Sequence, residues 1–112
     1  MIRIAVVGEI GSGKTYVSNL FDLPVFNADK EVEKIYNSNR SAFKKLKSKL
    51  PKFIISFPVQ KDYIKNAIRH NSKNIKLISS VIHPIVRKNM NEFLRKNKTK
   101  KAVVLDLSLI HI

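Results

Sequence analysis

A glycine-rich loop between a predicted strand and a predicted helix constrains this chain more than any other stretch. Residues 8–15 read Gly-Glu-Ile-Gly-Ser-Gly-Lys-Thr, which has the spacing Gly-x4-Gly-Lys-Ser/Thr of a P-loop. The apolar run over residues 2–7 predicts a buried strand, and residues 14–21 have the apolar spacing of a helix. A strand that leads through such a loop into a helix is typical of an α/β fold that binds a nucleoside triphosphate.

The residue types in this loop suit the binding of a triphosphate. Glycines let consecutive backbone N–H groups point into one concavity, and the helix that follows adds the positive end of its dipole. Lys14 brings a mobile charge to the β- and γ-phosphates, and the hydroxyl of Thr15 can ligate Mg²⁺. The alternative, a glycine turn that binds nothing, is disfavoured because strand, loop, Lys-Thr pair and helix occur together.

The composition restricts the class of protein. A chain of 112 residues suits one small domain, and it has no apolar run of about 18 residues that could cross a membrane. The absence of cysteine excludes disulfides and thiolate metal sites. The N-terminal Met-Ile-Arg-Ile enters the first predicted strand directly, which leaves no room for a signal peptide. We therefore expect a cytoplasmic protein without a membrane partner.

The formal net charge of +14 allows two interpretations. One is a polyanionic partner such as nucleic acid. The other is codon bias, because the excess is mostly Lys and accompanies many Asn and Ile, all of which have AT-rich codons. A nucleic-acid surface more often carries Arg and clustered aromatic residues. We favour codon bias and expect no specific nucleic acid, although the charge would still steer anionic nucleotides.

Two acidic residues follow predicted strands. Residues 25–26 predict a very short strand after Pro24, and Asp29 falls just beyond its carboxyl end. Residues 102–106 predict a buried strand that ends in Asp106. Ligands bind at the carboxyl ends of the strands in open α/β sheets, so both carboxylates are candidate site residues.

Each of these two acids also has a plain structural interpretation. Asp29 suits the N-cap of a helix predicted over residues 30–36, and residue type alone favours the cap. Asp106 completes a Walker-B-like pattern, whose Asp can hold Mg²⁺ through water, but four apolar residues and an Asp are a common sequence.

The long stretch between the second and third strands is predicted to be helical. Apolar spacing predicts helices over residues 41–50, 60–71 and 75–82, and Pro84 is predicted to begin another that runs to residue 96. His83 would then lie at a junction of two helices, where a lone His is more often structural than a ligand. The order of elements predicts an α/β fold with a parallel sheet, in which helices build a wall for a phosphate acceptor.

Three stretches together resemble dephospho-CoA kinase, the last enzyme of coenzyme A synthesis. The loop is close to the family's Gly-Gly-Ile-Gly-Ser-Gly-Lys-Ser/Thr, and residues 25–29 (Val-Phe-Asn-Ala-Asp) are similar to its apolar-Asp-Ala-Asp. Residues 81–86 (Val-Ile-His-Pro-Ile-Val) are similar to its Leu-His-Pro signature. The resemblance covers residues 1–106. It implies a three-layer fold of the P-loop NTPase type, truncated before the later strands and lid.

The resemblance implies transfer of the γ-phosphoryl group of ATP to the ribose 3′-hydroxyl of dephospho-CoA. Lys14 and Asp29 would be the catalytic residues, with Asp29 accepting or orienting the acceptor hydroxyl. Thr15 and Asp106 would hold Mg²⁺, and His83 would line the acceptor side. Nucleotide binding falls to six consecutive residues: Gly11, Ser12, Gly13, Lys14, Thr15 and Tyr16.

The chain departs from the family pattern at three places. Glu9 replaces a glycine at a variable position of the loop, which the spacing tolerates. Asn27 replaces the first Asp of Asp-Ala-Asp, which loses a charge and puts a metal or hydrogen-bonding role there in doubt. Residues 107–112 read Leu-Ser-Leu-Ile-His-Ile where the family has Pro-Leu-Leu-x-Glu. A transposase end sequence used in sequencing libraries encodes this hexapeptide in one frame. We therefore interpret residues 1–106 as the N-terminal part of the kinase domain, with helical acceptor-binding insertions, and residues 107–112 as a non-native tail.

Two other functions remain open. One is another P-loop small-molecule kinase that acts on a nucleoside monophosphate or a shikimate-like acceptor, which the His83-Pro84 pair and residues 27–29 disfavour. The other is a basic, non-catalytic module that binds nucleic acid. For the leading interpretation we expect the 112-residue chain to be inactive alone, because a kinase lid normally completes the site.

Overall fold

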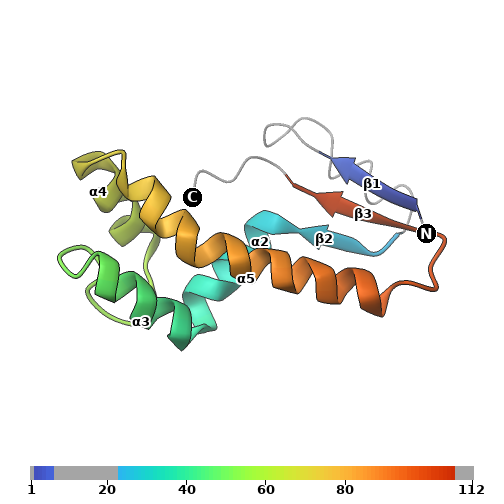
Figure 1. Cartoon of the computed structure of the whole chain (residues 1–112), viewed down its shortest axis with the longest axis horizontal. Coiled ribbons are helices and arrows are strands. Elements are labelled where there is room, and N and C mark those ends of the chain that lie inside the picture. The colour runs from blue at the N-terminus through green and yellow to red at the C-terminus, as the bar shows by residue number, and fades with distance from the viewer. Residues whose placement is uncertain (1, 7–22, 108–112) are drawn as a thin grey trace. The chain divides into compact units, whose positions relative to one another are not determined.

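The computed structural model describes residues 2–6 and 23–107 (Figure 1). The described residues form three strands and four helices. In chain order they are β1 (Ile2–Val6), β2 (Val25–Asn27), α2 (Ala28–Ser38), α3 (Arg40–Lys49), α4 (Lys61–His70), α5 (Asn74–Lys96) and β3 (Ala102–Asp106). The predicted P-loop and the helix after it, residues 8–21, lie outside the described residues.

The three strands form a parallel sheet in the order β1-β3-β2, as Figure 1 shows. The central strand, β3, is buried along its whole length, which suits a run of Ala, Val, Val and Leu that is covered on both faces. The amide of Val104 donates to the carbonyl of Pro24 over 2.8 Å, just before β2 begins. The predicted α/β class and parallel sheet are therefore confirmed.

The chain divides into two compact units. The strand unit lies within residues 1–31 and 86–110, and the helical unit comprises residues 32–85. In the strand unit, the ring of Phe26 packs against that of Phe93, with 5.6 Å between centroids. Its other buried apolar residues come from β3 and from helical positions Ala28, Val86 and Leu94.

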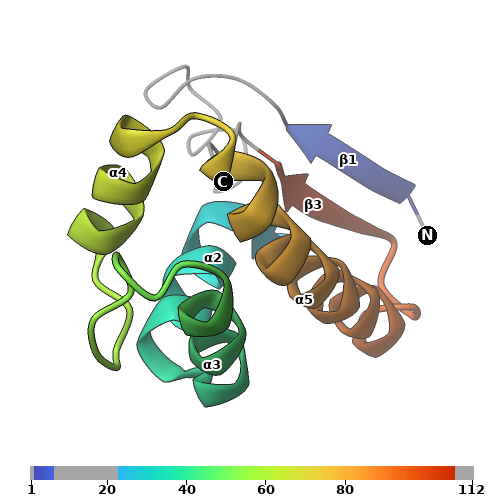
Figure 2. The ribbon, with the colours of Figure 1, turned by 60° about the vertical axis from the view of Figure 1, so that its left-hand side comes forward.

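The helical unit has its own apolar core. Helix α3 begins after Asn39, whose side-chain oxygen accepts a hydrogen bond from the amide of Ala42 over 2.9 Å. The predicted inner face of this helix is buried, with Leu46 fully inaccessible to solvent. Figure 2 shows the order of α2, α3 and α4 and the long helix α5 that follows them. The remaining core residues include Val32, Ile35, Ile54, Ile64, Ala67, Ile78 and Ile82.

One predicted boundary is wrong. Pro84 does not begin a new helix, because α5 runs without interruption over residues 74–96 with Pro84 inside it. A proline inside a helix costs about 3 kcal/mol, since it lacks the N–H and its ring crowds the preceding turn. Ile78, Ile82 and Val86 are buried at a four-residue spacing through this point. Burying such side chains contributes about 1.5–3 kcal/mol each, which offsets the cost of the proline.

Candidate functional site at the carboxyl end of the sheet

The carboxyl ends of the three strands meet at one line of residues. Asp106, the last residue of β3, is the register partner of Val6 on β1 and of Asn27 on β2. In the sequence, the P-loop pattern of residues 8–15 follows the end of β1, and Asp29 follows the end of β2. Strand ends of this kind are the usual ligand-binding position in open parallel sheets. We call Val6, Asn27 and Asp106, together with Asp29, the strand-end site.

Asn27 makes two different hydrogen bonds with its side chain. Its oxygen Oδ1 accepts from the amide of Lys30 over 3.0 Å, and its Nδ2 donates to Oδ2 of Asp106 over 3.1 Å. The two partners fix which way the amide points, since only the nitrogen can donate and only the oxygen can accept. Asn27 is therefore the N-cap of α2 and a link to β3 at the same time.

The position of Asp29 excludes the cap interpretation. Helix α2 already begins at Ala28, and Asn27 supplies the cap, so Asp29 is the second residue of the first turn. Its side chain is half-buried. An acid in the first turn interacts favourably with the helix dipole, by about 0.3–1 kcal/mol. The sequence therefore placed Asp29 correctly beyond the strand end, and its expected capping role is wrong.

Asp106 is a buried carboxylate. Only 3% of its surface is exposed. A buried charge is costly unless hydrogen bonds compensate it, and the amide of Asn27 supplies one such bond. The prediction that β3 ends in an acid at the carboxyl end of the sheet is confirmed.

The described residues do not form a metal site by themselves. Within residues 2–6 and 23–107 there is no group of three or more His, Cys, Asp or Glu side chains that could hold an ion. This donor set suits Mg²⁺ only in its usual manner with nucleotides, where phosphates and water complete the shell around one or two protein ligands. The six predicted nucleotide-binding residues, Gly11, Ser12, Gly13, Lys14, Thr15 and Tyr16, lie outside the described residues.

His83 does not lie at a helix junction. It is an exposed residue within α5 and belongs to the helical unit, whereas Asp29 and Asp106 belong to the strand unit. The expectation that His83 marks a break between two helices is wrong for the same reason as the prediction for Pro84. Its assignment to the acceptor side remains a prediction.

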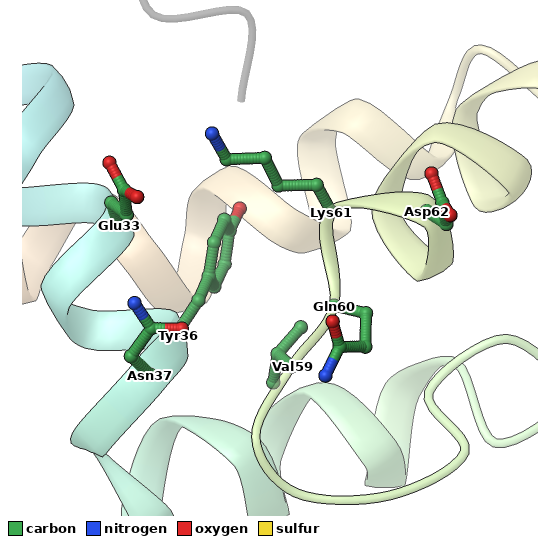
Figure 3. Close-up of a pocket in the computed structure, with 7 residues that line it drawn as sticks. All are labelled: Glu33, Tyr36, Asn37, Val59, Gln60, Lys61 and Asp62. Carbon is green, nitrogen blue, oxygen red and sulfur yellow. The ribbon is translucent and has the colours of Figure 1, made fainter.

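The helical unit contains a pocket of about 250 Å³ that the sequence did not indicate (Figure 3). The hydroxyl of Tyr36 is buried and has no hydrogen-bond partner within the described part of the chain, and burial raises the pKa of this phenol. No predicted site residue contributes to its wall. Seven residues line the pocket: Glu33, Tyr36, Asn37, Val59, Gln60, Lys61 and Asp62.

Asn27 is the residue of the strand-end site whose contacts the sequence did not predict. Its replacement of an acid suggests a loss, yet its side chain forms a hydrogen bond between β2 and β3. A local signal existed, because Asn is a preferred N-cap and Lys30 follows at the position whose amide such a cap bonds. The bond to Asp106 had no local signal, since 79 positions separate the two residues.

Among residues 2–6 and 23–107, no helix has both the length and the apolar character that a membrane crossing requires.

The chain is similar to known proteins over nearly all of its length. A solved crystal structure from Thermus thermophilus has a TM-score of 0.76 with 24% identity, and the alignment covers 96% of this chain and 56% of that one. This likeness shows that the fold is shared.

Curated relatives give a closer comparison. Proteins named dephospho-CoA kinase from Zymomonas mobilis and Agrobacterium fabrum are 29% and 30% identical to it, each over 98% of this chain. The chain spans 57% and 58% of the length of these relatives. The family model for dephospho-CoA kinase matches residues 2–111. Because that match covers almost the whole sequence, the chain belongs to the dephospho-CoA kinase family.

Proposed function

We propose that the protein to which this chain belongs transfers the γ-phosphoryl group of ATP to the ribose 3′-hydroxyl of dephospho-CoA. The products are ADP and coenzyme A. Family membership supports this proposal, and so does the register that brings the ends of β1, β2 and β3 together at Asp106. The proposal depends on this register. It places Asp106 between the end of β1, after which the P-loop sequence begins, and the end of β2, after which Asp29 follows.

Asp29 is the proposed partner of the acceptor hydroxyl. In the reaction a bond forms between the ribose 3′-oxygen and the γ-phosphorus, and the bond from that phosphorus to the bridging oxygen of ADP breaks. The hydroxyl proton passes to a carboxylate, and Asp29 is half-buried at the start of α2 with the cap role already filled by Asn27. A positioned base of this kind contributes about 10²–10⁴-fold to the rate.

Charge stabilisation is the proposed task of the loop residues. Lys14 and the backbone amides of Gly11, Ser12, Gly13, Thr15 and Tyr16 would bind the phosphates, where positive groups stabilise the charge that develops on the transferred group. Mg²⁺ would supply further positive charge to the phosphates. Thr15 and Asp106 would hold it.

The acceptor side and the state of the chain are further parts of the proposal. His83, exposed on α5, is the proposed contact to dephospho-CoA. We also propose that the protein acts in the cytoplasm, that residues 107–112 are a non-native tail, and that the 112-residue chain lacks kinase activity alone. The short span relative to the curated relatives supports the last point.

The test is a panel of acceptors supplied to the protein encoded by the complete gene. ADP release from ATP should require dephospho-CoA and should yield coenzyme A. Adenylate and shikimate, the acceptors of other P-loop kinases, should give only the background rate. Phosphorylation of adenylate or shikimate without use of dephospho-CoA would show that the proposal is wrong.

A further inference from the structure

We infer that Asn27 is a positioning residue for phosphoryl transfer, because one neutral side chain holds the carboxylate of Asp106 and begins the helix that carries Asp29. The expected effect on the reaction rests on the proposed function, whereas the two hydrogen bonds are features of the structure itself.

The surroundings of Asn27 leave its side chain little freedom. The residue before it, Phe26, is buried and packs against Phe93, and the residue after it, Ala28, is 1% exposed. Asn27 and Asp106 are direct register partners on adjacent parallel strands. With its backbone held on both sides, the amide reaches Lys30 with its oxygen and Asp106 with its nitrogen.

The two tasks need an acceptor and a donor, and the amide of Asn provides them on separate atoms. An Asp at position 27, which the family pattern has there, could cap α2 as well as Asn does, but a carboxylate has no N–H to donate to Oδ2 of Asp106, which lies 3.1 Å from Nδ2 of Asn27. A Ser would have only one oxygen to accept from Lys30 and to donate to Asp106. Asn thus keeps the Asp106 carboxylate in one orientation before any nucleotide or cation arrives.

This arrangement has a consequence for catalysis. Partners that orient a ligating carboxylate are part of a site's preorganisation, and their loss typically costs about 10–100-fold in metal affinity or activity. Because the same side chain begins α2, it also fixes the turn from which Asp29 extends. Where the family pattern has a second acid, Asn27 therefore provides a hydrogen bond to Asp106.

The chain contains a matched control for this inference. Asn39 is also a half-buried N-cap, and its Oδ1 accepts from the amide of Ala42 over 2.9 Å. Within the described ranges no carboxylate accepts a hydrogen bond from its Nδ2. Changing Asn to Ala at either position removes the cap oxygen. Only at position 27 does that change also remove a hydrogen bond to a carboxylate.

The experiment compares three variants of the protein encoded by the complete gene: N27A, N39A and the exchange N27D/D106N. We expect N27A to lower Tm by about 5–10 °C, because it loses a helix cap and a bond to a carboxylate. It should also lower kcat with dephospho-CoA about 10–100-fold. N39A loses a cap alone, so it should lower Tm by only about 2–4 °C and leave kcat unchanged.

The exchange variant tests the hydrogen bond by itself. It rebuilds an amide-to-carboxylate bond with the partners reversed, so its Tm should be higher than that of N27A. Its kcat should be low in any case, because the carboxylate of Asp106, a proposed ligand of Mg²⁺, is lost. The effect on the reaction is therefore measured in N27A.

Four outcomes would overturn the inference. They are an N27A Tm equal to that of the wild type, an equal loss of Tm in N39A, an exchange Tm no higher than that of N27A, and an N27A kcat that is unchanged despite a lower Tm. Failure of the proposed function is distinguishable. A wild type that ignores dephospho-CoA but shows the expected Tm pattern overturns the kinase role and leaves the Asn27–Asp106 link intact.

Discussion

The starts of α2 and α4 carry the same acidic residue at the same helical position but in different surroundings. Asp29 is the second residue of α2 and Asp62 is the second residue of α4. Helix α2 follows a strand and has a side-chain cap that is bonded to Asp106, whereas α4 follows a loop and Gln60 makes no cap hydrogen bond. Asp29 is half-buried and Asp62 is exposed.

Helical position alone therefore does not identify a functional carboxylate. Both acids gain the same favourable interaction with a helix dipole. Of the two, only Asp29 follows a strand end, where Asn27 bonds a buried carboxylate that comes from a distant part of the chain. Topology, rather than local sequence, makes the difference between a solvated acid and a candidate catalytic one.

The largest effect is expected when each of the two acids is changed to its amide. Asp29→Asn should lower kcat with dephospho-CoA by about 10²–10⁴-fold, because the amide cannot accept the hydroxyl proton. Asp62→Asn makes the same chemical change at the same helical position and should leave kcat within about twofold, as expected of a surface substitution. Steady-state assays of both variants in the complete protein test this. Similar losses in the two variants would show that the strand-end location has no special role.

A second prediction concerns packing in the helical unit. Leu46 is fully buried in α3, so Leu46→Ala should lower the free energy of unfolding by about 2–5 kcal/mol, through lost burial and the cavity left behind. Leu77 is 37% exposed on α5, and Leu77→Ala should therefore cost clearly less. Urea denaturation of the two variants measures the difference. Equal costs would contradict the burial assigned to α3.

The smallest expected effect concerns the two tyrosines of the helical unit. The buried hydroxyl of Tyr36 has no partner within the described ranges, whereas the hydroxyl of Tyr63 shares a hydrogen bond of 3.1 Å with Ser56. Tyr36→Phe should leave stability unchanged or raise it by up to about 1 kcal/mol, because it removes an unsatisfied polar group. Tyr63→Phe should lower stability slightly. A larger loss in Tyr36→Phe than in Tyr63→Phe would show that the Tyr36 hydroxyl is satisfied.

The pH dependence of stability gives a further test of Tyr36. Burial raises the pKa of this phenol above its ordinary value of about 10. The unfolded chain therefore releases this proton near pH 10 while the folded chain retains it, so stability is unaffected below about pH 10 and falls as the pH rises toward the folded-state pKa. Stability of the wild type should fall more steeply above pH 10 than that of Tyr36→Phe. Parallel curves in alkaline thermal melts would contradict this assignment.

The sequence predicted the elements of the strand unit well. The runs at residues 2–6, 25–27 and 102–106 are mostly apolar, and Gly8, Pro24 and the polar residues 97–101 lie next to or near them, so the three strands could be found locally. The carboxyl-end placement of Asp29 and Asp106 followed from parallel strands alone. What local patterns could not provide was the central position of β3, since it depends on pairing across most of the chain.

The incorrect predictions have physical causes. A local rule treats Pro84 as a helix start, but the apolar stripe of Ile78, Ile82 and Val86 keeps one helix continuous through it. Asn27 was assessed by the charge it lacks, whereas its role comes from an N–H that needs a partner 79 positions away. In both cases tertiary contacts override a local preference.

The fate of the γ-phosphoryl group shows whether the protein transfers it to dephospho-CoA. The complete protein would be incubated with γ-¹⁸O-labelled ATP and dephospho-CoA, and the products analysed by ³¹P NMR and mass spectrometry. We expect one ADP for each coenzyme A, with the label in a phosphate on the ribose 3′-oxygen. ADP formation without coenzyme A, or label in a phosphate on any other oxygen, would contradict the account.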